Sequence, residues 1–112
     1  SALHLLKNIS NMEINDIIAT VKAVSEFKLD IQDYLDFLAV WYRDILYFKA
    51  TRDSNGLVFK DEVNVITDQI NKSSYEGIEN ILKGLQTAKT RLNANVNFDM
   101  AMELLLLTMK EN

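Results

Sequence analysis

The absence of proline from all 112 residues is the feature that most limits how this chain can fold. Proline removes a backbone donor and clashes with the preceding helical turn, and an interior glycine costs about 1 kcal/mol relative to alanine. Only three glycines are present, and 48% of the residues are hydrophobic, which is enough for a buried core. We therefore expect an all-α fold, a compact bundle of about five to six helices.

The length fits one domain, so residues 1–112 are expected to form a single helical domain. The chain opens on Ser1 and Ala2 rather than on Met, and an apolar helical pattern is already running at Leu3. We therefore expect the sequence to be a fragment of a longer protein.

Hydrophobic periodicity and capping residues predict the individual helices. A short helix is expected to end near residue 8. Two matches to the capping box, Ser10 with Glu13 and Ser73 with Glu76, suggest where later helices begin. The longer helices are then expected over residues 10–27, 31–50 (capped by Asp30), 61–71, 73–92 and 98–112 (capped by Asn97), with a polar loop over residues 51–56.

The segment 31–50 is apolar on most sides, so it is predicted to be the central helix of the bundle. Within it, Trp41 and Tyr42 are expected in the core, with Arg43 and Asp44 at the rim. Large aromatic residues and Arg are also frequent anchors at protein interfaces, which keeps an interface role open for this motif.

The last helix is almost wholly apolar, and it is the first candidate for a contact surface unless core packing uses all of it. Leu105 and Leu106 are its central apolar residues. Gly77 and Gly84 are seven residues apart and share one face of the preceding helix, where their cost is offset if another backbone approaches closely.

Catalytic and cofactor-binding signatures are missing from the sequence. Without cysteine there is no disulfide, thiolate nucleophile or Cys-ligated metal, and a reducing compartment is consistent with this. His4 is the only histidine, so no His cluster or Ser-His-Asp arrangement can form, and we expect it to have a packing or surface role. No Gly-Lys-Ser/Thr phosphate loop occurs. We expect a non-catalytic domain with no cofactor, no metal and no small-molecule substrate.

The balance of charge and the lengths of the apolar runs narrow the range of partners. A net charge of −4 opposes direct nucleic-acid binding, which needs cationic groups to replace counterions at phosphate. The most apolar segment, residues 100–109, is far below the ~20 residues that span a bilayer. Neither nucleic acid nor membrane is therefore an expected partner.

One alternative comes from the segment between Asp53 and Glu62, which partly matches a calcium-binding loop of the EF-hand type. Asp53, Asn55, Gly56 and Glu62 occupy ligand or turn positions, but Thr51 stands where a leading carboxylate is required. A helical calcium- or small-ligand-binding module is therefore kept as the alternative to a polar loop between helices.

Two motifs carry a resemblance to a known family. Trp41-Tyr42-Arg43-Asp44-Ile45-Leu46 in the central helix is followed by Arg91-Leu92-Asn93-Ala94-Asn95-Val96-Asn97 before a Leu-rich last helix. In this order the motifs resemble the collar domain of clamp loaders, specifically the C-terminal domain of the delta-prime subunit of bacterial DNA polymerase III. The resemblance covers the chain from about Ser10 to its end.

This resemblance implies a role in assembly rather than in chemistry. In the family, the collar joins the clamp-loader subunits whose ATPase-type domains open the sliding clamp and load it onto primed DNA for replication. It implies gamma/tau- and delta-type subunits as partners, a cytoplasmic location, and a parent protein that is one subunit of a DNA polymerase holoenzyme. The nucleotide-type and zinc-binding modules of the family lie N-terminal to this region.

Overall fold

The computed structural model describes residues 1–26 and 30–112, and these ranges contain helices and no strand. This confirms the all-α prediction. Three short 3₁₀ turns, at Ile9–Asn11, Ser54–Gly56 and Lys60–Glu62, lie between the α-helices. The α-helices are α1 (Ala2–Asn8), α2 (Ile14–Glu26), α3 (Ile31–Thr51), α4 (Val63–Lys72), α5 (Tyr75–Asn93) and α6 (Phe98–Glu111).

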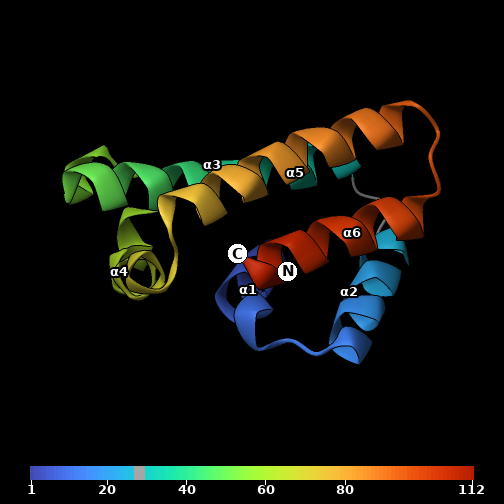
Figure 1. The fold of residues 1–112 in the computed structure, drawn as a ribbon, viewed down its shortest axis with the longest axis horizontal. Helices are drawn as coiled ribbons and strands as arrows, with labels where there is room; N and C mark the ends of the chain where they lie inside the picture. Colours follow the sequence, from blue (N-terminus) through green and yellow to red (C-terminus); the bar gives the residue numbers. More distant parts are fainter. Residues whose placement is uncertain (27–29) are drawn as a thin grey trace.

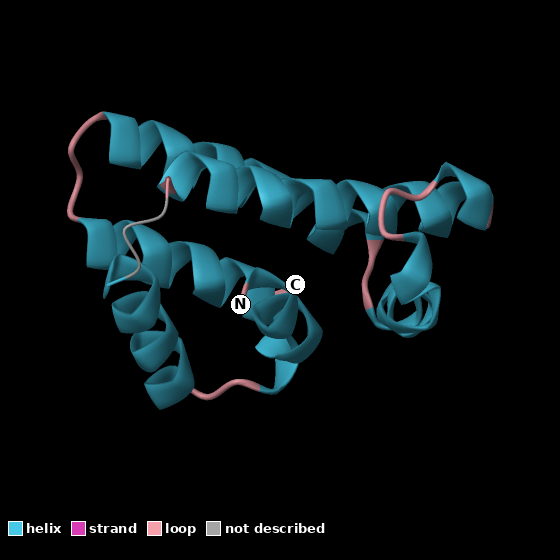
Figure 2. Ribbon diagram, turned by 180° about the vertical axis from the view of Figure 1, so that it is seen from behind, coloured by secondary structure: helices cyan, strands magenta, loops and turns pink. Residues whose placement is uncertain are grey.

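The two longest helices, α3 and α5, lie side by side along the length of the molecule (Figure 1). Helix α6 packs against α5 and also against α2, while α1 and α4 pack against α3. The N- and C-termini lie close together in both Figure 1 and Figure 2. None of the described helices has the length and apolar character needed to cross a membrane.

Helix α3 is the central element that its sequence predicts. It packs against α1, α4 and α5, so apolar residues on several of its sides are enclosed. The side chains of Leu35, Leu38 and Trp41 are completely buried. Ile45 of α3 is also among the largest fully buried side chains, and the other helices contribute Leu6, Ile17, Ile66, Ile70, Ile78, Ile81, Leu85 and Met102 to this group.

Asp30 caps α3 as predicted, because its carboxylate accepts the N–H of Gln32 at 2.9 Å. At the other end the helix continues to Thr51, one residue beyond the expected boundary. The N–H of Arg52 then bonds the Phe48 carbonyl from a left-handed conformation with φ of 56°. The loop that was predicted to begin at Thr51 therefore begins one residue later, at Arg52.

The capping box predicted at Ser10 is wrong. Residues 9–11 form a 3₁₀ turn that continues from α1, and α2 begins only at Ile14. Asp16 accepts the N–H of Glu13 at 3.0 Å, so the side chain at the third helical position reaches back across the first turn. The capping interaction is therefore present, but three residues later than expected. The predicted end of this helix, near Phe27, falls outside the described residues.

The second predicted capping box is displaced by one residue. Ser73 follows the end of α4, and Ser74 caps α5 by accepting the N–H of Gly77 at 2.9 Å. Each of the two adjacent serines has a hydroxyl that can cap a helix, and Ser74 is the one that caps because α5 begins at Tyr75. Helix α4 itself begins at Val63 rather than at Asp61, because a 3₁₀ turn occupies residues 60–62.

Gly77 and Gly84 both face α6, which explains why glycine occurs at these two positions of α5. A Cβ atom at Gly77 would lie 2.8 Å from the backbone oxygen of Asn112. At Gly84 it would lie 3.2 Å from the Cγ2 atom of Thr108. The expected close approach of another backbone is confirmed at Gly77, whereas at Gly84 the nearest atoms belong to side chains of α6.

Candidate functional site

The Trp41 side chain is fully buried and is joined to two other helices by hydrogen bonds. Its Nε1–H donates to Oε1 of Gln69 on α4 at 3.0 Å. The Nε2 atom of Gln69 donates in turn to the carbonyl of Leu6 on α1, also at 3.0 Å. This relay connects α3, α4 and α1 and leaves the indole N–H satisfied inside the core.

Tyr42 is also buried, so the predicted core placement of both aromatic residues is confirmed. Burial raises the pKa of Tyr42, because the phenolate would be poorly solvated there. The phenol therefore stays neutral at ordinary pH. Arg43 lies on the exposed side of α3, in agreement with its predicted place at the rim.

The predicted position of Asp44 at the rim beside Arg43 is wrong. Asp44 is buried, with only 4% of it exposed. Its Oδ1 accepts the N–H of Val58 at 3.0 Å, and its Oδ2 accepts the N–H of Phe59 at 2.8 Å. The carboxylate thus fastens the segment before α4 to the central helix, using charge-assisted bonds to two backbone donors.

Asn95 and Asn97 shape the turn between α5 and α6. Asn95 has a φ of 59°, a left-handed conformation that Asn tolerates better than most residues. The N–H of Val96 bonds the Arg91 carbonyl at 3.0 Å, and the N–H of Asn95 bonds that of Leu92 at 3.3 Å, which is a Schellman motif. Asn97 then caps α6, as predicted, by accepting the N–H of Met100 at 3.0 Å.

Leu105 and Leu106 lie in the core, with exposed fractions of 2% and 0%. They belong to the face of α6 that packs on α5 and α2. Their side chains are therefore not available as a contact surface, and any interface on α6 must use other residues.

The Asp53–Glu62 segment does not support the calcium alternative. The Asp53 carboxylate accepts bonds from the Tyr47 hydroxyl and the Asn55 N–H, both at 3.0 Å. Glu62 pairs with Lys7 at 2.9 Å. Across residues 1–26 and 30–112, no three acidic, His or Cys side chains are grouped to hold a metal ion. The hydrogen bond from Tyr47 to Asp53 also raises the pKa of that tyrosine.

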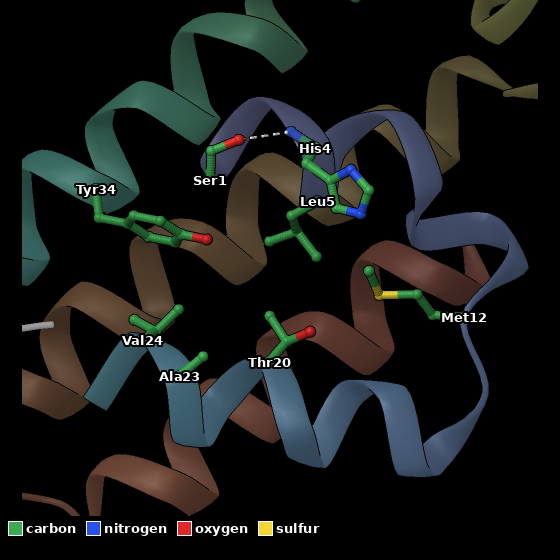
Figure 3. Close-up of a pocket in the computed structure, with 8 residues that line it drawn as sticks. All are labelled: Ser1, His4, Leu5, Met12, Thr20, Ala23, Val24 and Tyr34. Carbon is green, nitrogen blue, oxygen red and sulfur yellow. Dashed lines mark hydrogen bonds between the residues drawn. The ribbon is translucent and has the colours of Figure 1, made fainter. Parts of the chain in front are cut away.

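His4 is exposed at the edge of an apolar groove between α1, α2 and α3 (Figure 3). The groove has a volume of about 430 Å³. The Tyr34 ring extends into it toward Leu5, and burial raises the pKa of this tyrosine. The lining carries the hydroxyls of Ser1, Thr20 and Tyr34 and the imidazole of His4, but no carboxylate, Lys or Arg. The His4 ring contacts the side-chain amide of Asn8 at 3.4 Å, and the Ser1 hydroxyl accepts the backbone N–H of His4, so no hydroxyl of this lining is paired with the imidazole as a base.

Sequence reasoning missed Gln69, the residue that connects three helices. It is one of several polar residues in the amphipathic helix α4, and no local pattern distinguishes it from a solvent-facing glutamine. Its role depends on Trp41 and Leu6, which are 28 and 63 residues away in sequence. Trp41, Asp44 and Asn97 therefore act as structural elements of the bundle, because their side chains form hydrogen bonds within it.

Comparison with known proteins assigns the sequence to a family. Neither the curated proteins nor the solved structures contain a match to the chain. The family model described as "DNA polymerase III, delta subunit, C terminal" matches residues 3–111, which is nearly the whole sequence. That domain is part of a non-catalytic clamp-loader subunit. The chain belongs to the family of the C-terminal domain of the DNA polymerase III delta subunit.

Proposed function

We propose that residues 1–112 form one collar domain, that of a delta-prime-type subunit, and that this domain holds its subunit within the clamp loader of a bacterial DNA polymerase III. The observation that carries the proposal is the family match over residues 3–111. The finer choice of delta-prime rests on the order of the motifs around Trp41 and Asn95, which resemble that subunit.

The use of the motif residues within the fold supports an assembly role. Trp41 and Asp44 connect the central helix to its neighbours, and Asn95 and Asn97 set the direction of the last helix. Residues used in this way define the shape of a domain. A domain that acts by packing against other subunits requires a fixed shape more than it requires a reactive group.

The proposed partners are the gamma/tau- and delta-type subunits, with the cytoplasm as the location of the complex. The net charge of −4 makes direct binding to the DNA backbone unfavourable. The ATPase-type modules of the partner subunits would then supply the chemistry of clamp loading, and this domain would keep its own subunit in the complex with them.

Reconstitution with purified subunits tests the proposal. The full-length protein that contains this chain is mixed with the gamma/tau and delta subunits and analysed by size-exclusion chromatography and pull-down. Co-elution in a single complex is expected. Failure of the full-length protein to associate, under conditions where the other subunits associate with one another, would contradict the proposed function.

The assignment to delta-prime needs a separate comparison. One mixture lacks the authentic delta-prime subunit and another lacks the authentic delta subunit, and the full-length protein is added to each. We expect it to complete only the mixture without delta-prime. Completion of the other mixture instead would retain the assembly role and assign the chain to delta.

A further inference from the structure

The two sides of α6 differ in how far the core uses them. The inner side contributes Ala101, Met102, Leu105, Leu106 and Met109, all buried against α5, α2 and the turn at residues 9–11. An amphipathic helix at the surface normally carries polar residues on its other side. The outer side of α6 departs from this expectation.

Apolar side chains occur on the outer side at helical spacing. Met100 is 57% exposed and Leu104 is 44% exposed, and both rank among the large hydrophobic residues left outside the core. Leu107, at the next position of this pattern, is partly buried at the edge of the core. The spacing i, i+4, i+7 aligns the three side chains along one stripe, which is the pattern by which helices dock into grooves or onto other helices.

The charged residues of α6 beside this stripe are three acidic residues and Lys110. Asp99 and Glu111 are exposed and Glu103 is half-buried, and none of the three takes part in the ion pairs formed among residues 1–26 and 30–112. Lys110, the basic residue of α6, donates instead to the Ser10 carbonyl at 3.4 Å. We call Met100, Leu104, Leu107 and the three carboxylates of Asp99, Glu103 and Glu111 the outer strip.

We infer that the outer strip of α6 is a docking surface for an apolar helix face bordered by Lys or Arg on a neighbouring clamp-loader subunit. The inference rests on the proposed function and specifies the surface through which this domain would bind a neighbouring subunit. Apolar side chains at the centre supply the contact area, while three carboxylates that form no ion pair among residues 1–26 and 30–112 favour a partner of opposite charge. Leu105 and Leu106 take no part in the contact, because the core encloses them.

The test compares variants of the full-length protein in binding to the gamma/tau and delta subunits. The double variant Met100→Ser/Leu104→Ser removes the apolar centre, and we expect its affinity to fall by about tenfold or more. Its matched control is Ile14→Ser/Ile18→Ser on α2, where the side chains are 56% and 49% exposed. The control is expected to bind like the unmodified protein, and circular dichroism should show that both variants remain folded.

Charge is tested with Asp99→Lys/Glu103→Lys, against Glu76→Lys/Glu79→Lys on α5 as the matched acidic control. We expect only the first variant to weaken association and to reduce its dependence on salt, because an opposite-charge contact is screened as ionic strength rises. If the unmodified protein assembles and both outer-strip variants bind equally well, the docking surface is elsewhere and the proposed function stands. If the unmodified protein does not assemble, the proposed function and the docking surface are both wrong.

Discussion

Replacing Asp44 by Ala isolates one interaction that fastens the segment before α4 to the central helix. The carboxylate is 4% exposed and accepts the backbone N–H groups of Val58 and Phe59 at 3.0 and 2.8 Å. Alanine at this position leaves two backbone donors without their acceptor. It also leaves the Phe59 ring, which meets Trp41 edge-on with ring centroids 5.4 Å apart, less firmly held.

The expected cost follows from the number and kind of these bonds. A hydrogen bond to a charged group contributes about 1.5–3 kcal/mol, so two of them give roughly 3–6 kcal/mol. Val58 is 70% exposed, and water at its N–H would recover part of this loss. We therefore expect Asp44→Ala to lower the free energy of unfolding by about 3–4 kcal/mol. Asp44→Asn keeps one acceptor and should cost about half as much.

Urea unfolding followed by tryptophan fluorescence measures this cost directly, because Trp41 is the only tryptophan and lies in the core. Asp36→Asn on the same helix is the matched control. Asp36 forms an exposed pair with Lys89, so its loss should cost no more than about 1 kcal/mol. If the free energy of unfolding of Asp44→Ala is within about 1 kcal/mol of that of the unmodified chain, the two hydrogen bonds of Asp44 do not hold the segment before α4 as we infer.

Further predictions concern the last helix, its preceding turn and alkaline pH. Asn95→Val should destabilise the chain by about 1–2 kcal/mol, and Asn95→Gly should be nearly neutral, since φ of 59° disfavours a β-branched residue; urea unfolding of both variants checks this. Leu105→Asp and Leu106→Asp should each lower the free energy of unfolding by about 3–5 kcal/mol, because each buries an unpaired charge. Leu104→Asp, at an exposed position, should have little effect on the melting temperature. Parent-like melting and assembly of both buried variants would contradict the placement of α6. Burial raises the pKa of Tyr42, so its stabilising effect is complete below the ordinary pKa of about 10 and falls as pH rises above that value. Tyr42→Phe should make the unfolding free energy less sensitive to alkaline pH, and equal pH dependence of the two proteins would count against this.

Helix content and the central position of α3 could be predicted because they depend on composition and periodicity. A chain without proline, with a segment apolar on most sides, has few ways to bury that segment except inside other helices. Helix starts were less predictable. Ser73 and Ser74 offer the same capping hydroxyl, and Ser10 has a good capping sequence within what became a 3₁₀ turn.

The buried position of Asp44 could not be predicted from the motif alone. Beside Arg43 on a helix it has the pattern of a surface charge pair, and its true partners are backbone N–H groups, which leave no signal in the sequence. Gln69 is a similar case, since its two partners lie on other helices. The capping role of Asn97 could be predicted, because helix capping is a local interaction and the partner, the N–H of Met100, is only three residues away.

The central claim is that this helical domain acts by holding its subunit to other subunits of the clamp loader. Analytical ultracentrifugation of the full-length protein with the gamma/tau and delta subunits, with and without residues 1–112 of the present chain, tests it most directly. We predict one stoichiometric complex for the full-length protein and separate species when residues 1–112 are deleted, provided that circular dichroism shows the remainder to be folded. A complex that forms equally well without these residues would contradict the claim.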